Sequence, residues 1–161
     1  AATLAACGGG SGGNSSNSAG AMAPNTSATV SAEEIGDAGN VLVDSSGQAL
    51  YASDEEMGGK VLCTDACLSF WTPLTIGSGK ATGSSLPGKL GIVERPDRAR
   101  QVTYNGKLLY SFNEDQPGEV TGDDFMDAFA GRQFTWHVVH SDSADDSSGG
   151  GTSTGGGPYG Y

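Results

Sequence analysis

The chain has 161 residues, with 19 acidic against 8 basic residues and a formal net charge of −11 at pH 7. This charge argues against nucleic acid as a partner, because phosphate binding needs clustered lysines and arginines. It also argues against adsorption to anionic headgroups by charge alone. No run approaches the roughly 20 apolar residues of a membrane-spanning helix.

The two ends of the chain are poor in apolar residues. Residues 8–20 are nearly all Gly, Ser and Asn, and residues 141–157 are mostly Ser, Gly, Thr and Asp. Such segments cannot bury enough apolar surface to offset the entropy of ordering them. The sequence therefore predicts one small domain over residues 29–140, followed by a disordered tail over residues 141–161.

The start of the chain, Leu4-Ala5-Ala6-Cys7 followed by three glycines, is typical of a bacterial lipobox. Residues 1–6 are then the end of a signal peptide. Cys7 would carry a diacylglycerol, and residues 7–28 would form a lipid-anchored, flexible tether. The predicted location is the extracytoplasmic face of the cell membrane. The alternative is a chance match in an Ala-rich leader.

Short β-prone runs separated by turn residues fill the first half of the domain. We expect a strand over residues 29–35, a hairpin over residues 41–51 and a helical turn over residues 65–70. A further strand is expected to begin at Trp71 or Leu74, and residues 77–88 are expected to form a loop.

The second half is organised around Asn105-Gly106, which joins predicted strands over residues 100–104 and 107–112. This dipeptide is the strongest short hairpin signal, because both central residues of a type I′ turn need positive φ. A lead strand is expected over residues 90–93 and a closing strand over residues 134–140. Residues 114–129 are expected to be an acidic loop with a helical turn over residues 124–129.

An internal repeat relates the two halves at a shift of 59 residues. The equivalent pairs are Gly47 and Gly106, Leu50 and Leu109, Tyr51 and Tyr110, and Glu56 and Asp115; with changed spacing, Trp71 matches Trp136. Repeat one covers residues 29–80 and repeat two residues 89–140. We predict an all-β fold in which each repeat gives about four antiparallel strands, packed around one core as a sandwich or a barrel-like domain.

These residues resemble the secreted repeat of unknown function, a family of predicted lipoproteins with a Yx(F/W/Y)xxD motif that is common in actinobacteria. Repeat two carries the motif in full over residues 110–115 (YSFNED). Repeat one departs from it over residues 51–56 (YASDEE), which lack the aromatic residue and have Glu for Asp. The resemblance implies export, a lipid anchor and tandem β-repeats. The family has no established activity, so the resemblance implies no catalytic residue.

Cys63 and Cys67 form an even pair in an exported domain, which predicts a disulfide. The alternative is a pair of thiolates that bind copper or exchange electrons, with His137 as a third ligand. His137 and His140 are the only histidines. On one strand they would point to opposite faces, so at most one could join such a site.

Tyr110 and Phe112 are expected to lie in the core, with Asp115 capping the turn over residues 116–118. The alternative is a pocket that binds a ligand or a partner through these three residues, with Trp71 and Trp136 as further candidates. The neighbouring acids are expected to be a solvated loop, with Ca²⁺ binding as the alternative; they are Glu114, Asp115, Glu119, Asp123, Asp124 and Asp127. Their spacing does not fit an EF-hand.

The sequence contains no HExxH or GxxxxGK[ST] motif. Two stretches fit GxSxG, residues 9–13 and 151–155, but both lie in the Gly/Ser-rich ends without the strand-to-helix context that a nucleophilic serine needs. We therefore expect a non-catalytic accessory or binding module without a cofactor. Its expected partner is a protein at the membrane surface, in a membrane or envelope complex such as a respiratory assembly. The alternative function is a copper-handling or thiol-redox protein that uses Cys63 and Cys67.

Overall fold

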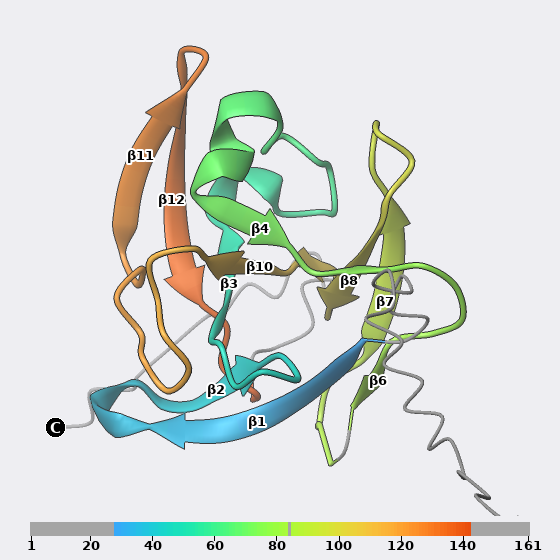
Figure 1. Ribbon diagram of the computed structural model, residues 1–161, viewed down its shortest axis with the longest axis vertical. Helices are drawn as coiled ribbons and strands as arrows, with labels where there is room; N and C mark the ends of the chain where they lie inside the picture. The colour runs from blue at the N-terminus through green and yellow to red at the C-terminus, as the bar shows by residue number, and fades with distance from the viewer. Residues whose placement is uncertain (1–27, 84, 143–161) are drawn as a thin grey trace, which may run out of the picture.

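The computed structural model describes residues 28–83 and 85–142, in which twelve strands and three 3₁₀ turns make up the regular structure. The all-β prediction is confirmed, and several antiparallel sheets pack together (Figure 1). The lipid site at Cys7, the tether up to residue 27 and the tail from residue 143 lie outside the described residues. Within those residues, no helix is long and apolar enough to span a membrane.

The strands at the start of the domain form a small sheet of their own. β1 (Thr29–Ile35) pairs antiparallel with β2 (Gly39–Val43) across the 3₁₀ turn η1 (Gly36–Ala38). The predicted first strand is therefore confirmed with its bounds. β6 (Thr82–Gly83), in a region expected to be a loop, adds to the other edge of β1 in parallel.

The central sheet interlocks the two repeats. It has five strands in the order β11-β12-β3-β10-β4, with bounds β3 (Leu50–Ser53), β4 (Trp71–Pro73), β10 (Tyr110–Phe112), β11 (Phe125–Phe129) and β12 (Arg132–Val138). β3 of repeat one and β10 of repeat two are neighbours at its centre (Figure 1). Each of them is flanked on its outer side by the closing strand of the other repeat.

The register of this sheet follows a local two-fold relation. Tyr51 pairs with its equivalent Tyr110. Trp136 pairs with Ser53, and Trp71 pairs with Phe112, which is the equivalent of Ser53 at the shift of 59 residues. The two repeats therefore pack crosswise, because each central strand has both of its neighbouring strands from the other repeat.

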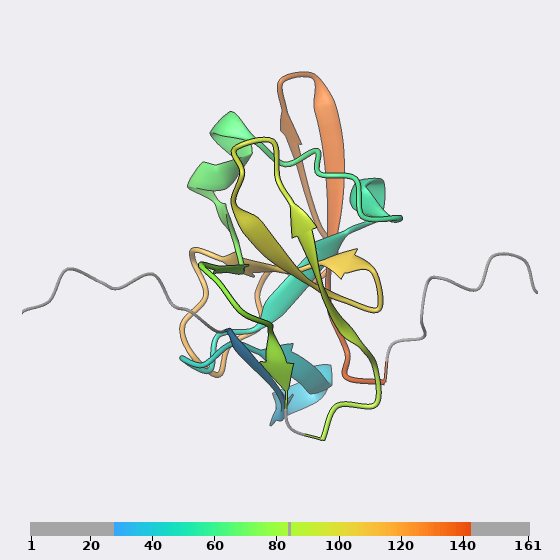
Figure 2. The same ribbon diagram turned by 90° about the vertical axis from the view of Figure 1, so that its right-hand side faces the viewer.

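A third sheet holds the predicted hairpin. β8 (Arg100–Tyr104) lies between β5 (Thr75–Ile76) and β7 (Leu90–Glu94), and β9 (Lys107–Leu108) also pairs with β8 (Figure 2). Asn105 and Gly106 both have positive φ, at 49° and 82°, which confirms the predicted turn.

The predicted strand over residues 107–112 is divided at Leu109. Its first part, β9, pairs with β8, whereas its second part, β10, pairs with β3 and β4 of the central sheet. Leu109 N–H still donates to the carbonyl of Val102, and its own carbonyl accepts from Leu74 N–H. One continuous alternating run thus serves two sheets.

The helical turn predicted over residues 124–129 is wrong, because Phe125–Phe129 is strand β11, paired along its length with β12. Ala130 and Gly131 adopt positive φ of 52° and 77°, so a tight turn reverses the chain there. Alternation turns Phe125, Asp127 and Phe129 toward one face of the hairpin. The helical turn predicted near Asp65 is confirmed as the 3₁₀ turn η3 (Asp65–Ser69).

The interior consists of two hydrophobic clusters, where one core was predicted. All four residues of β3 are buried, and alternation sends Tyr51 into one cluster and Leu50 into the other. The first cluster holds Tyr51, Tyr110, Phe112, Phe134, both tryptophans and the two cysteines. β3 is covered on both faces and for this reason separates the two clusters.

Candidate functional site

The two repeats exchange hydrogen bonds between their motif residues. Tyr51 Oη of repeat one donates to Asp115 Oδ2 of repeat two at 2.5 Å, and Tyr110 Oη of repeat two donates to Glu56 Oε1 of repeat one at 3.0 Å. All four side chains are buried. We call each tyrosine together with the acid that it binds a half-site. Each half-site therefore contains the tyrosine of one repeat and the acid of the other.

Each acid also closes the loop that follows it. Glu56 Oε1 accepts from the backbone N–H groups of Leu62 and Cys63, at 2.6 and 2.7 Å. Asp115 Oδ1 accepts from the backbone N–H of Thr121 at 3.1 Å and from its hydroxyl. The predicted cap of residues 116–118 by Asp115 is wrong, because Glu119 Oε2 accepts from Gln116 N–H and the Asp115 carboxylate reaches past the turn.

Burial changes the protonation chemistry of these groups. Burial raises the pKa of Tyr51 and of Tyr110 well above the usual range of a phenol, and the carboxylate bonded to each hydroxyl raises it further. Burial also raises the pKa of Glu56, against the lowering effect of its backbone donors and of Arg95. Both tyrosines therefore stay neutral donors well beyond neutral pH.

Arg95 is a buried cation that the sequence analysis did not identify. Its Nη1 donates to Gln101 Oε1 at 2.6 Å and to Tyr110 Oη at 3.1 Å, and its Nη2 donates to the carbonyl of Cys63 at 2.7 Å. Its Nε and Glu56 Oε2 are buried without a hydrogen-bond partner among the described residues. Arg95 brings positive charge to the half-site of Glu56 and Tyr110.

The two predicted repeat tryptophans are stacked on each other. The rings of Trp71 and Trp136 lie 3.9 Å apart at an interplanar angle of 12°. Both indole N–H groups donate to one carboxylate, that of Asp127, at 2.7 and 3.0 Å. The acid on β11 thus satisfies two buried donors at the contact between the repeats.

The predicted disulfide is present between Cys63 and Cys67, whose Cα atoms are 5.4 Å apart. Both cysteines are fully buried. Because the pair is oxidised in this structure, it offers no thiolates for the copper site that was the alternative.

The five candidate ligand-binding side chains lie in the core. Tyr110, Phe112, Asp115, Trp71 and Trp136 are all buried. None of them lines the cavities around His137, Arg95 and Phe134. Their burial supports the core role over the pocket that was the alternative.

The acidic segment is more structured than the solvated loop that we expected. Asp115 and Asp127 accept hydrogen bonds from buried donors, as described above. Asp123 Oδ1 accepts from the backbone N–H of Val138 at 2.9 Å. Asp124 has a positive φ of 58° and lies against His137. Asp115, Asp123 and Asp127 thus bind groups of the second half of the domain. The β11–β12 hairpin brings Asp123 and Asp124 beside His137.

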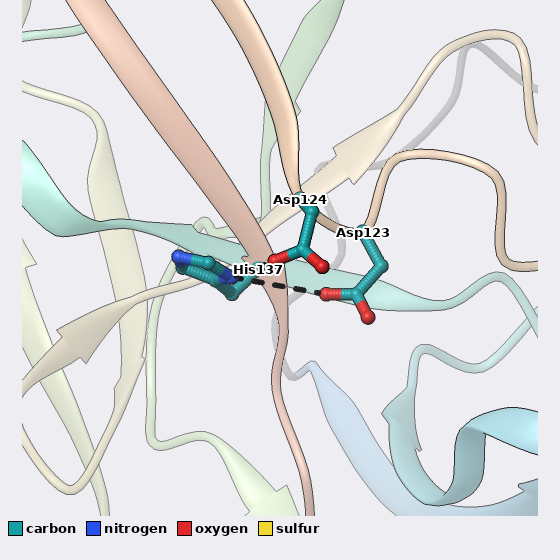
Figure 3. Close-up of side chains that lie close together, drawn as sticks. All are labelled: Asp123, Asp124 and His137. Carbon is teal, nitrogen blue, oxygen red and sulfur yellow. Dashed lines mark ion pairs between the residues drawn. The ribbon is translucent and has the colours of Figure 1, made fainter.

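His137 and the acids around it form a polar cluster on the surface (Figure 3). Its Nδ1 is 3.0 Å from Asp124 Oδ1 and 3.9 Å from Asp123 Oδ1, and its Nε2 is 3.1 Å from Asp54 Oδ2. His140 follows β12, which ends at Val138, and both histidines line one cavity of about 250 Å³. The closing strand predicted to reach residue 140 ends two residues earlier, so the alternation of one strand does not apply to His140.

Comparison with known proteins supports the resemblance inferred from the motifs. No curated protein and no solved structure gives a significant match to this chain. Residues 91–140 match the family model described as a secreted repeat of unknown function, and this segment contains Arg95, the motif of repeat two and His137. Repeat two of this chain is therefore similar to a secreted repeat whose function has not been established.

Proposed function

We propose that this domain is a non-catalytic binding module, held at the extracytoplasmic face of the cell membrane by a lipid on Cys7. The match to a secreted repeat supports export. The motif side chains are buried, which supports a structural role for the motif. A partner would therefore bind to other residues, on the surface of the domain. The lipobox-like sequence before Cys7 supports the anchor.

The observation that carries the binding role is the apolar edge of the central sheet. β11 is the outermost strand, and its outer side has no partner strand among the described residues (Figure 1). Phe125 and Met126 on β11 are 41% and 59% exposed, and nearby Phe70, 45% exposed, packs on Phe129. Natural proteins usually protect such edges with charges, prolines or bulges.

The occupant that fits this edge is an extended segment of a protein at the membrane surface. Strand addition provides main-chain hydrogen bonds, while alternate side chains of the added strand contact the apolar residues. The net charge of −11 disfavours an acidic segment. Membrane and envelope complexes, respiratory assemblies included, are the proposed hosts.

Met126→Lys tests the docking edge, because lysine on an edge strand opposes strand addition. The full-length lipoprotein is cross-linked in its native membrane and purified in mild detergent. We expect one dominant partner with the wild type and its loss with Met126→Lys. Met57→Lys is the matched control, because Met57 is also exposed but lies outside β11. Equal capture by both variants, or no partner with the wild type, would contradict the proposal.

Intact mass of the same preparation tests the anchor and the alternative function together. We expect a diacylated Cys7, and a disulfide that resists mild reductant in the folded protein because both of its sulfurs are buried. An unmodified Cys7 would refute the anchor. Thiols of Cys63 and Cys67 that alkylate readily, or a bound copper ion, would favour the copper or thiol-redox alternative.

A further inference from the structure

A second chemistry is concentrated at His137, away from the β11 edge. We propose that His137, Asp123 and Asp124 form a binding site for a divalent transition ion of the Zn²⁺ class. One ligand atom from each of these residues can be chosen so that all lie within 4.8 Å of one another. The ligands come from two segments that the fold brings together, the stretch before β11 and the closing strand β12 (Figure 3).

The orientation of the imidazole supports this site. Asp54 Oδ2 lies 3.1 Å from Nε2, whereas Nδ1 lies 3.0 Å from Asp124 Oδ1, so the two ring nitrogens have different acids as neighbours. With an ion on Nδ1, Nε2 carries the proton and donates it to Asp54. Metal-binding histidines usually donate their second ring N–H to such a carboxylate, which fixes the tautomer and the ring. Asp54 thus acts as a positioning residue on the side of the ring away from the ion.

The spacing fits an ion between the ligands. Zn²⁺ bonds to nitrogen and oxygen of about 2.0–2.1 Å place tetrahedral ligand atoms about 3.3 Å apart. Nδ1 lies 3.0 Å from Asp124 Oδ1 and 3.9 Å from Asp123 Oδ1, values on either side of that spacing. Asp123 is held in place because its Oδ1 accepts from the backbone N–H of Val138.

The charge at the site also favours a cation. Three carboxylates surround one imidazole, and among the described residues the ion pairs of these three acids are with His137 alone. The mixed nitrogen and oxygen donors favour Zn²⁺, Co²⁺, Ni²⁺ or Mn²⁺ over Ca²⁺, which takes oxygen ligands. Three protein ligands leave one tetrahedral position for water or a partner's side chain.

The test is Zn²⁺ titration of the full chain, free of any tag and treated with chelator, followed by calorimetry and by Co²⁺ absorption. We expect one ion per chain and a Co²⁺ spectrum of nitrogen and oxygen coordination. Asp124→Asn should weaken Zn²⁺ binding at least about tenfold, and His137→Gln should abolish it. Asp54→Asn should weaken it roughly 10- to 100-fold, as for other outer carboxylates.

Asp65→Asn is the matched control. Asp65 is also exposed and also has positive φ, of 52°, but it lies in the η3 turn outside the cluster. Asp65→Asn should leave the Zn²⁺ affinity unchanged. Asn tolerates positive φ, so Asp124→Asn should keep the fold. This variant therefore tests the Zn²⁺ site even if His137→Gln unfolds. Absence of Zn²⁺ binding by the wild type would overturn the proposal. Equal Zn²⁺ affinity of the wild type and Asp124→Asn would also overturn it, because the ion would then not be bound by Asp124.

Discussion

Tyr51 and Tyr110 lie opposite each other on the two central strands, but their half-sites are built differently. Tyr110 Oη is bonded to both a buried acid, Glu56, and a buried cation, Arg95. Tyr51 Oη is bonded to Asp115 and to the backbone N–H of Gly122, and no cation is bonded to it among the described residues. One half-site is a charged network, whereas the other is completed by neutral donors.

The loops that the two acids close differ in the same way. The loop after Glu56 is fastened by the disulfide between Cys63 and Cys67. At a shift of 59 those positions are Gly122 and Met126, and the loop after Asp115 is held by the Thr121 hydroxyl instead. A Cβ on Gly122 would come within 2.9 Å of Trp71, so repeat two needs glycine where repeat one has a cysteine. Both half-sites thus keep the hydrogen bond between tyrosine and acid. They differ in the contact that fastens the loop after the acid.

The largest effect is expected from Arg95→Met, which removes the cation from one half-site only. The loss leaves three buried partners of the guanidinium without a donor, Gln101 Oε1, Tyr110 Oη and the carbonyl of Cys63, and each unsatisfied group costs about 1–3 kcal/mol. Urea denaturation should show a loss of this size. Arg132→Ala, at an exposed arginine, should change stability by less than about 0.5 kcal/mol. Similar losses for the two variants would show that the buried hydrogen bonds of Arg95 do not stabilise the fold.

Removal of the disulfide should have a smaller effect. Cys63→Ala combined with Cys67→Ala releases a ring of five residues, for which chain entropy predicts a loss of about 2 kcal/mol. The loss should appear as a shift of the urea midpoint at constant m-value. An unchanged midpoint would mean that the Glu56 contacts alone hold this loop.

The smallest effect is a change in alkaline stability. Because the pKa of each tyrosine is raised in the folded state, the folded state keeps a proton that the unfolded state releases above about pH 10. Stability is therefore fully present below pH 10 and is lost as pH rises further. Tyr51→Phe and Tyr110→Phe should each reduce this slope by about 1.4 kcal/mol per pH unit. Slopes equal to that of the wild type between pH 10 and 11.5 would contradict this assignment.

The sequence predicted the elements whose signals are local. The Asn105-Gly106 turn, the first strand, the disulfide and the equivalence of Tyr51 with Tyr110 all follow from short patterns, and the structure confirms them. The shift of 59 showed which residues are equivalent. It carried no information on whether a tyrosine binds the acid of its own repeat or that of the other.

The features that the sequence did not predict depend on distant contacts. Arg95 lies between charged and turn residues, so no periodicity marks it as buried, and its partners come from β8, β10 and the disulfide loop. β11 was mistaken for a helical turn because Ala130-Gly131 is a weaker turn signal than Asn105-Gly106. Without β11, Asp123 and Asp124 could not be placed beside His137, and Asp127 could not be placed between the two indoles.

The crosswise exchange between repeats is tested most directly by double-mutant cycles in urea denaturation. Tyr51→Phe with Asp115→Asn, and Tyr110→Phe with Glu56→Gln, should each show a coupling energy of roughly 0.5–3 kcal/mol. The pairs within one repeat, Tyr51 with Glu56 and Tyr110 with Asp115, should couple more weakly. Stronger coupling within each repeat than between repeats would contradict the interlocked arrangement.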